Sequence, residues 1–400
     1  MQTMRPNPSR SDHKAIALMY LAFFVLGLVG SMTGPLVPAL RHIFALDFRQ
    51  AMAAQWLVLV VIGALAWPAA RLMQSWGVFR LLCLALGLMA AGCLAVSFAA
   101  GSGYFASVLL ALAVIATGTT LLQVAGNPLT TALGAPEKSH ARLALAQGFN
   151  SLGVLGGVHL GSSLMLGQDA AQGVQLTYGI LAVLTLAGLA MFLCGGKAFP
   201  TSALANETAA PSEALTSRWA WAGAAAIALY VGAEGAIGSI MINFLHQPHV
   251  LNLPMAEAGR ASAKIYWGGA LAGRFAGSWL LTRYRAPRLL GLMAALACAL
   301  CLTVAVTQGP MAGYAALAIG LCNAIMFPTI FSLTLARSKA PASAVSGLLC
   351  TAIAGGALIS ILVGEMADHT GLAQAFLVPL VAYGLIALFA ALKPAIWPQG

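Results

Sequence analysis

Charged side chains are scarce in this sequence, which holds only 10 aspartate and glutamate residues among 400. Charged residues of both signs make up 8% of the chain, against about 25% in soluble globular proteins. A chain with so few charges cannot cover the surfaces of two or three soluble domains, although its length would allow them. The composition is instead 60% hydrophobic, with a mean hydropathy of +0.89, which is typical of a polytopic membrane protein.

Motifs for catalysis and metal binding are lacking as well. The sequence contains no P-loop, HExxH, GxSxG or paired-carboxylate pattern. Its 7 cysteines form no CxxC pair and no His/Cys cluster at metal spacing. We therefore predict that the protein is not an enzyme and has no metal site and no cofactor other than a coupling ion. Membrane topology explains the net charge of +10 better than nucleic-acid binding does.

The sequence is dominated by long apolar segments. About 20 apolar residues cross a bilayer as a helix, and on this scale the chain is expected to form twelve spans. Their expected limits are 15–40, 51–71, 79–100, 104–133, 142–166, 174–196, 219–245, 261–283, 287–307, 311–336, 343–366 and 372–393. The polar connector 197–218 separates 1–196 from 219–400. The predicted fold is an all-α membrane protein with two pseudo-symmetric six-helix bundles.

The distribution of lysine and arginine predicts the orientation in the membrane. With twelve spans both termini share a side, and that side carries fifteen of the 20 basic residues against four on the other. Because cytoplasmic loops are enriched in lysine and arginine, both termini and the central connector are expected in the cytoplasm. The first apolar segment is too long for a signal-peptide core, so we expect it to be retained as a helix. The lipid bilayer would be that of a bacterial-type cytoplasmic (inner) membrane.

The two predicted bundles share an internal repeat. The fourth span contains AGNPLTTALG (125–134) and the tenth contains IMFPTIFSLT (325–334). Their prolines, Pro128 and Pro328, are 200 residues apart, and each precedes a basic loop. Secondary transporters often consist of such repeats and bind their substrate near the membrane midplane.

Glu234 is the acidic residue that lies deepest in an apolar span, about sixteen residues into 219–245. A charge at that depth costs about 2.5–3.5 kcal/mol and commonly has a functional role. Gly232, Gly235 and Gly238 recur around it, which makes the helix thin there. We favour a role in cation or substrate binding over the alternative, a structural hydrogen bond to a neighbouring helix.

Amides and aromatic residues provide candidate contacts for a neutral, polyhydroxylated ligand, because amides both donate and accept hydrogen bonds. Gln123 and Asn127 are four residues apart in one span, and Gln147 and Asn150 are three apart in the next, so each pair shares a helix face. Each amide singly could equally hold two helices together. The other candidates for substrate binding are Asn323, Tyr266 and Trp267.

Two further polar residues lie inside predicted spans. Arg274 is expected to act as a gating or anchoring residue on the cytoplasmic side. For His159 a structural hydrogen bond is favoured over a place in the transport pathway.

The motifs resemble those of a known family. Twelve spans in two halves with a central cytoplasmic connector resemble the major facilitator superfamily. LLQVAGNPLTTALG (121–134) and RLALAQGFNSLG (142–153) resemble the fucose–galactose–glucose symporters, typified by L-fucose permease. YVGAEGAIGSIMINF (230–244) and NAIMFPTIFSL (323–333) are similar to its glucose/galactose-transporter branch.

The resemblance also has departures. It implies two essential acids in the N-terminal half, but Gly34 and Gln123 stand at those positions here. At position 234 the permease has an amide, whereas the glucose/galactose branch has Glu, as this sequence does. We therefore hypothesise that the acid has moved to the C-terminal half and that Glu234 is the cation site.

The predicted function is secondary active import of a neutral sugar (a hexose such as glucose, galactose or fucose) by alternating access, coupled to H⁺ or Na⁺. A monomer would suffice. The alternatives are an uncoupled sugar facilitator and an exporter of drugs or lipophilic metabolites in the same fold. A sugar receptor that signals would need a soluble output segment, and the longest predicted cytoplasmic stretch, 197–218, is short.

Overall fold

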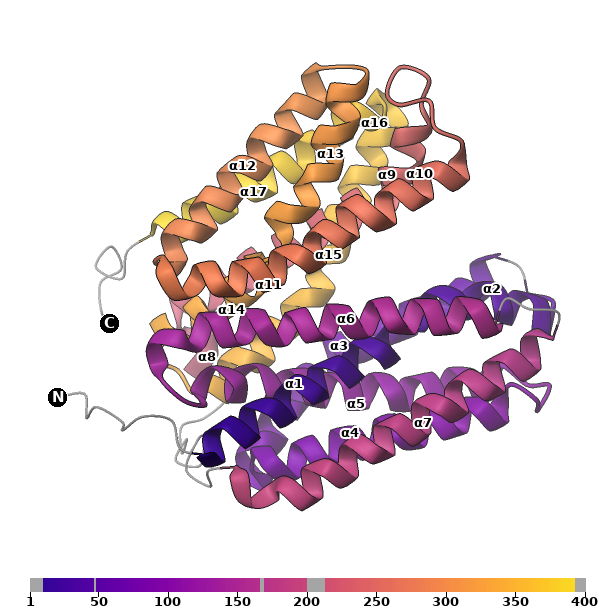
Figure 1. Cartoon of the computed structure of the whole chain (residues 1–400), viewed down its shortest axis with the longest axis vertical. Helices are drawn as coiled ribbons and strands as arrows, with labels where there is room; N and C mark the ends of the chain where they lie inside the picture. Colours follow the sequence, from indigo (N-terminus) through magenta and orange to yellow (C-terminus); the bar gives the residue numbers. More distant parts are fainter. Residues whose placement is uncertain (1–9, 47, 166–168, 200–212, 393–400) are drawn as a thin grey trace. The chain divides into compact units, whose positions relative to one another are not determined.

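A computed structural model of the chain describes residues 10–46, 48–165, 169–199 and 213–392 (Figure 1). Every regular element within these ranges is a helix, which confirms the all-α prediction. The chain forms two compact units. Residues 200–212, which make up most of the predicted connector, lie outside the described residues.

The first unit comprises residues 1–139, 146–213 and 341–351. Its long helices are α1 (Arg10–Gly30), α2 (Thr33–Phe44), α3 (Phe48–Trp76), α4 (Val78–Ala99), α5 (Phe105–Ala132), most of α6 (Ser139–Met165) and α7 (Ala170–Gly195). Two short 3₁₀ turns follow α5 and α7, at Pro136–Lys138 and Gly196–Ala198. Within this unit α4 lies beside α5 and α7 (Figure 1).

The second unit comprises residues 140–145, 214–340 and 352–400. After the short α8 (Glu213–Thr216), its helices are α9 (Arg218–His246), α10 (Met255–Ala261), the π-helix η3 (Ser262–Trp267), α11 (Gly268–Arg283), α12 (Ala286–Val306), α13 (Pro310–Asn323), α14 (Met326–Arg337), most of α15 (Ala342–Thr370), α16 (Leu372–Ala375) and α17 (Leu377–Ala391). Here α12 lies beside α13 and α17, and α9 packs on α14 and α17 (Figure 1).

Ten helical segments of the described residues are long and apolar enough to cross a membrane, and they correspond to ten of the twelve predicted spans. The predicted spans 142–166 and 261–283 are not among the ten. Both are helical, as α6 and as the series α10, η3 and α11. They contain the polar residues Gln147, Asn150, Lys264 and Arg274, which lower their hydropathy. Other candidate residues, such as Glu234 and Asn127, lie in spans that are among the ten.

Proline explains one interruption that the sequence analysis did not anticipate. The predicted span 311–336 is two helices, α13 and α14, which break at Ala324 and Ile325. Pro328 has no N–H to donate to the carbonyl of Ala324, four residues earlier, so the helical ladder is interrupted there. Pro128, its counterpart in the internal repeat, lies inside the continuous helix α5. The two halves of the repeat therefore differ in backbone geometry at corresponding prolines.

Close backbone approach at glycine holds the helices of each unit together. A Cβ atom on Gly153 of α6 would clash with the carbonyl oxygen of Phe24 in α1. In the second unit, a Cβ atom on Gly320 of α13 would clash with the carbonyl oxygen of Tyr266 in η3. Only glycine permits such contacts, and small residues serve this purpose in many membrane helices.

Candidate functional site

The acid in the middle of α9 has a basic neighbour. Nη2 of Arg274, in α11, lies 3.9 Å from Oε1 of Glu234, and each side chain is 16% exposed. A partly buried carboxylate is expensive unless an opposite charge compensates it, and the guanidinium provides that charge. The sequence analysis predicted a gating or anchoring role for Arg274 and did not predict that it pairs with Glu234.

Three buried polar atoms around this pair have no hydrogen-bond partner within the described residues. They are Oε1 of Glu234, Nε of Arg274 and the hydroxyl of Tyr230, although this hydroxyl interacts with the Glu234 side chain. Tyr230 is 1% exposed and lies one turn before Glu234 in α9, so the two side chains are on the same face. Buried polar groups are nearly always paired with protein, water or ligand. Tyr230 was not predicted as a site residue, although its spacing from Glu234 was visible in the sequence.

A chain of hydrogen bonds approaches Glu234 from the other side. The hydroxyl of Tyr383 (α17) donates to Oδ1 of Asn323 (α13) at 2.7 Å. Nδ2 of Asn323 donates to the hydroxyl oxygen of Tyr266 (η3) at 3.1 Å, and that hydroxyl donates to the backbone carbonyl of Glu234 at 3.1 Å. Four helical segments of the second unit therefore meet through polar groups at the level of Glu234.

This series of hydrogen bonds affects the predicted roles of two residues. Asn323 and Tyr266 are both 0% exposed, and both polar ends of the Asn323 amide are occupied. A sugar could contact Asn323 directly only if these bonds opened. With these hydrogen bonds in place, Asn323 orients Tyr266 against α9. Tyr383, which completes the chain, was not predicted as a site residue, since a tyrosine in an apolar terminal helix carries no pattern of its own.

Trp267 differs from its neighbour Tyr266 in being 46% exposed. Its ring meets that of Tyr266 edge-on, with centroids 5.1 Å apart and an interplanar angle of 88°. A Cβ atom on Gly238 would lie 2.8 Å from the indole, so the glycine allows Trp267 to pack on α9. Both aromatic residues belong to the π-helix, an element that occurs frequently at functional sites.

The amides of the first unit form one pair rather than a group of four. Nε2 of Gln147 donates to Oδ1 of Asn127 at 3.3 Å, which links α6 to α5. Asn127 is 0% exposed, and its Nδ2 has no partner within the described residues. Gln123 is half-buried, one turn before Asn127.

Asn150 makes an interhelical contact. Its Nδ2 donates to the carbonyl of Phe23 in α1 at 3.2 Å. One residue earlier, Phe149 stacks on Tyr20 of α1 with ring centroids 5.1 Å apart. Asn150 thus makes the interhelical hydrogen bond that the sequence analysis considered for each amide. His159 is exposed on the same helix.

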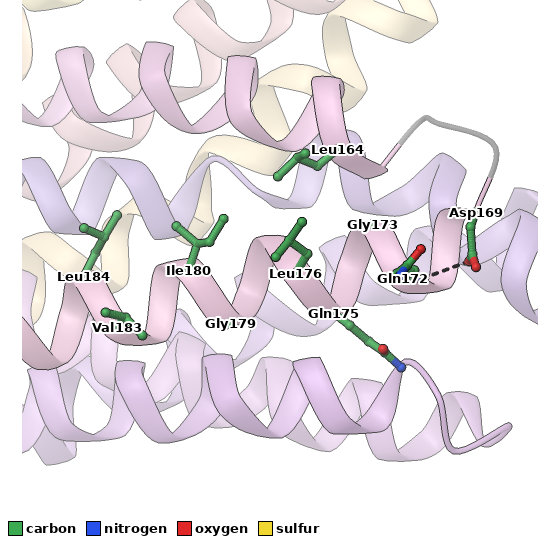
Figure 2. A pocket seen from close by; sticks show the side chains of 10 residues that line it. All are labelled: Leu164, Asp169, Gln172, Gly173, Gln175, Leu176, Gly179, Ile180, Val183 and Leu184. Atoms are coloured by element: carbon green, nitrogen blue, oxygen red, sulfur yellow. Dashed lines mark hydrogen bonds between the residues drawn. The ribbon is translucent and has the colours of Figure 1, made fainter.

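A groove of about 850 Å³ lies in the first unit, along α7 and the end of α6 (Figure 2). Its wall is mainly apolar and includes Leu176, Ile180 and Leu184. Asp169 at one end caps α7 by accepting a hydrogen bond from the backbone N–H of Gln172 at 2.9 Å. None of the predicted site residues lines this groove. Its lining does not include Glu234, Arg274 or Tyr230 either.

Comparison with known proteins gives matches along almost the whole chain. The family model described as Major Facilitator Superfamily matches residues 19–360. A glucose/galactose transporter of Brucella abortus biovar 1 is 36% identical over 386 residues, which cover 94% of this chain and 93% of that protein. The L-fucose-proton symporter of Escherichia coli K12 is 29% identical, with 96% of this chain and 93% of that protein covered. The crystal structure of the transporter FucP in the outward conformation has a TM-score of 0.86 at 26% identity, over 95% of this chain and 99% of that one.

Proposed function

Since this chain belongs to the major facilitator superfamily, we propose that it is a secondary transporter that imports a neutral sugar together with a cation bound at Glu234. The similarity to a glucose/galactose transporter and to an L-fucose-proton symporter supports a hexose or related sugar as substrate. As a member of a family of transporters, the chain is not expected to catalyse a chemical reaction.

The observation that carries the coupling proposal is the position of Glu234. It lies in the middle of α9, with Oε1 unpaired and Arg274 at 3.9 Å. A carboxylate in this position can take up and release a cation during the transport cycle, because its charge is costly at this depth. The alternative is a purely structural carboxylate that Arg274 of α11 holds through the ion pair.

We favour a proton over Na⁺ as the coupling ion. The relative from Escherichia coli K12 is described as an L-fucose-proton symporter, which supports a proton. A proton needs one carboxylate oxygen only, whereas a metal ion needs several oxygen ligands.

For the rest of the transport cycle we propose alternating access of a single sugar site. Gln123, Asn127 and Gln147 remain proposed contacts to sugar hydroxyls from the first unit. The protein would work as a monomer in a bacterial inner membrane. Both termini would be cytoplasmic, as the excess of lysine and arginine on that side predicts.

The test is uptake of labelled glucose, galactose and fucose into proteoliposomes under an imposed pH gradient or Na⁺ gradient, for wild type and Glu234→Gln. We expect the pH gradient to drive accumulation by wild type, while Glu234→Gln only equilibrates sugar across the membrane. If the variant accumulates sugar as well as wild type does, Glu234 is structural and the coupling proposal fails.

The same assay separates the alternatives. A wild-type protein that equilibrates sugar but accumulates it under neither gradient would be an uncoupled facilitator. A protein that takes up no sugar and instead binds lipophilic cations would be an exporter of drugs or lipophilic metabolites.

A further inference from the structure

We propose that Tyr230, Glu234 and Arg274 form a subsite for a vicinal diol of the sugar ring, with Trp267 as the surface on which the ring stacks. This inference rests on the proposed function and adds Tyr230, Glu234 and Arg274 to the sugar contacts in the second unit, where the sequence analysis named Asn323, Tyr266 and Trp267.

The unpaired atoms of the cluster have complementary hydrogen-bonding properties. Nε of Arg274 can only donate, Oε1 of Glu234 can accept whether the carboxyl group is ionised or carries a proton on Oε2, and the hydroxyl of Tyr230 can do either. In a vicinal diol, one oxygen can accept from Nε–H while the neighbouring hydroxyl donates to Oε1. The Tyr230 hydroxyl can then bond to either sugar oxygen. A lipophilic cation could satisfy Oε1 but would leave Nε–H of Arg274 unpaired.

The geometry of α9 places these groups in one row. Tyr230, Glu234 and Gly238 are spaced four residues apart and therefore lie on one face of the helix. The indole of Trp267 packs where Gly238 has no side chain. Trp267 is thus about one helical turn, ~6 Å of rise, from Glu234. Polar groups that bond the hydroxyls are followed along the helix by an aromatic ring that can cover the apolar face of a sugar.

Exposure and burial fit these two roles. Trp267 is 46% exposed even though Tyr266 beside it is completely buried, so its ring has surface left for a ligand. The Tyr230 hydroxyl, in contrast, is buried and interacts with the Glu234 side chain. Oε1 of Glu234 and Nε of Arg274 have no hydrogen-bond partner within the described residues. Buried polar atoms without a partner are costly, and a ligand that supplies the missing hydrogen bonds removes that cost.

The test measures sugar binding to the purified full chain in detergent for wild type, Tyr230→Phe and Trp267→Leu. The probes are glucose, galactose and fucose, followed by the monodeoxy analogues of whichever binds tightest. Tyr314→Phe, 60% exposed on α13, and Trp279→Leu, 59% exposed on α11, are matched controls away from the cluster.

We expect Tyr230→Phe to bind the parent sugar about threefold to tenfold more weakly. In wild type, at least one monodeoxy analogue should bind more weakly than the parent, and Tyr230→Phe should discriminate between that analogue and the parent less than wild type does. Trp267→Leu should weaken all analogues alike by about threefold to tenfold. Both control variants should bind as wild type does.

Thermal stability gives a second readout that a merely structural role would not reproduce. Whatever its melting temperature without sugar, Tyr230→Phe should lose part of the stabilisation that sugar confers on wild type. Unchanged affinity in Tyr230→Phe, or an equal loss for the parent and every deoxy analogue, would overturn the diol subsite while leaving sugar transport intact. If wild type binds none of the sugars, the proposed function itself fails, and the subsite with it.

Discussion

The ion pair between Glu234 and Arg274 allows a quantitative prediction. At the 3.9 Å between Oε1 and Nη2, Coulomb attraction is about 1 kcal/mol at the dielectric constant of water and about 4 kcal/mol at an effective value of 20. The distance exceeds the ~2.8 Å of a charge-assisted hydrogen bond, so attraction between the two charges is the whole interaction. Each side chain is only 16% exposed, which limits screening by solvent. We therefore expect a coupling energy between about 1 and 4 kcal/mol.

A double-mutant cycle measures this energy directly. Glu234→Gln and Arg274→Met each leave the other charge without a partner, which for a buried pair costs about 3–5 kcal/mol. The double variant leaves neither charge, so its loss should be smaller than the sum of the single losses by the coupling energy. The free energy of unfolding, from urea titrations in detergent micelles, is the suitable readout because both residues also belong to the proposed transport site.

An exposed pair in the same unit provides the control. Glu257 and Arg260 of α10 approach to 3.7 Å, slightly closer than the inner pair, but their side chains are 52% and 63% exposed. Their cycle, with Glu257→Gln and Arg260→Met, should give a coupling energy of about 0–1 kcal/mol. If the Glu234–Arg274 cycle were additive within about 0.5 kcal/mol, Arg274 would not compensate the buried carboxylate.

Two further predictions concern the packing around Tyr266. Tyr383→Phe removes the donor to Oδ1 of buried Asn323 and should lower the free energy of unfolding by about 1–3 kcal/mol. Thermal unfolding measures this loss, and an unchanged midpoint would mean that the amide needs no donor there. Gly320→Ala places a methyl group against the carbonyl of Tyr266 and should cost about 1–3 kcal/mol. Gly364→Ala is the control, because a Cβ atom on Gly364 would have no other atom within 4 Å, and it should be neutral or slightly stabilising in the same thermal assay. Equal effects of the two alanine substitutions would contradict the close approach of Gly320 to Tyr266.

The sequence was sufficient to predict the fold class because the physical constraint is strong. A chain with 8% charged residues has few ways to fold other than as helices in a membrane, and ten of the predicted spans have counterparts among the described helices. The break at Ala324 and Ile325 was missed, although Pro328 is its cause. Proline inside an apolar run does not determine whether the helix breaks, since Pro128 lies in an unbroken one.

The part of the site that could be predicted is the residue whose burial in a membrane span costs free energy by itself. Glu234 stands out in the sequence because its charge needs a compensating group, but the compensating Arg274 is 40 residues away in the chain. Spacing along one helix can indicate which residues share a face. It gives no information about which residue of another helix faces them, so neither the pair nor the bond from Tyr383 to Asn323 could be derived.

Tyr266 and Trp267 show why residue type alone could not assign the sugar contacts. Both are aromatic neighbours in one span, and both were predicted to contact the sugar. In the π-helix they point in different directions, so Tyr266 is completely buried and bonded to α9, whereas Trp267 keeps 46% of its surface exposed. Only the exposed ring can stack on a ligand without rearrangement. The buried ring can act on the sugar only through the position of Glu234. Substitutions at Tyr266 should therefore change coupling and stability, while those at Trp267 change affinity for sugar.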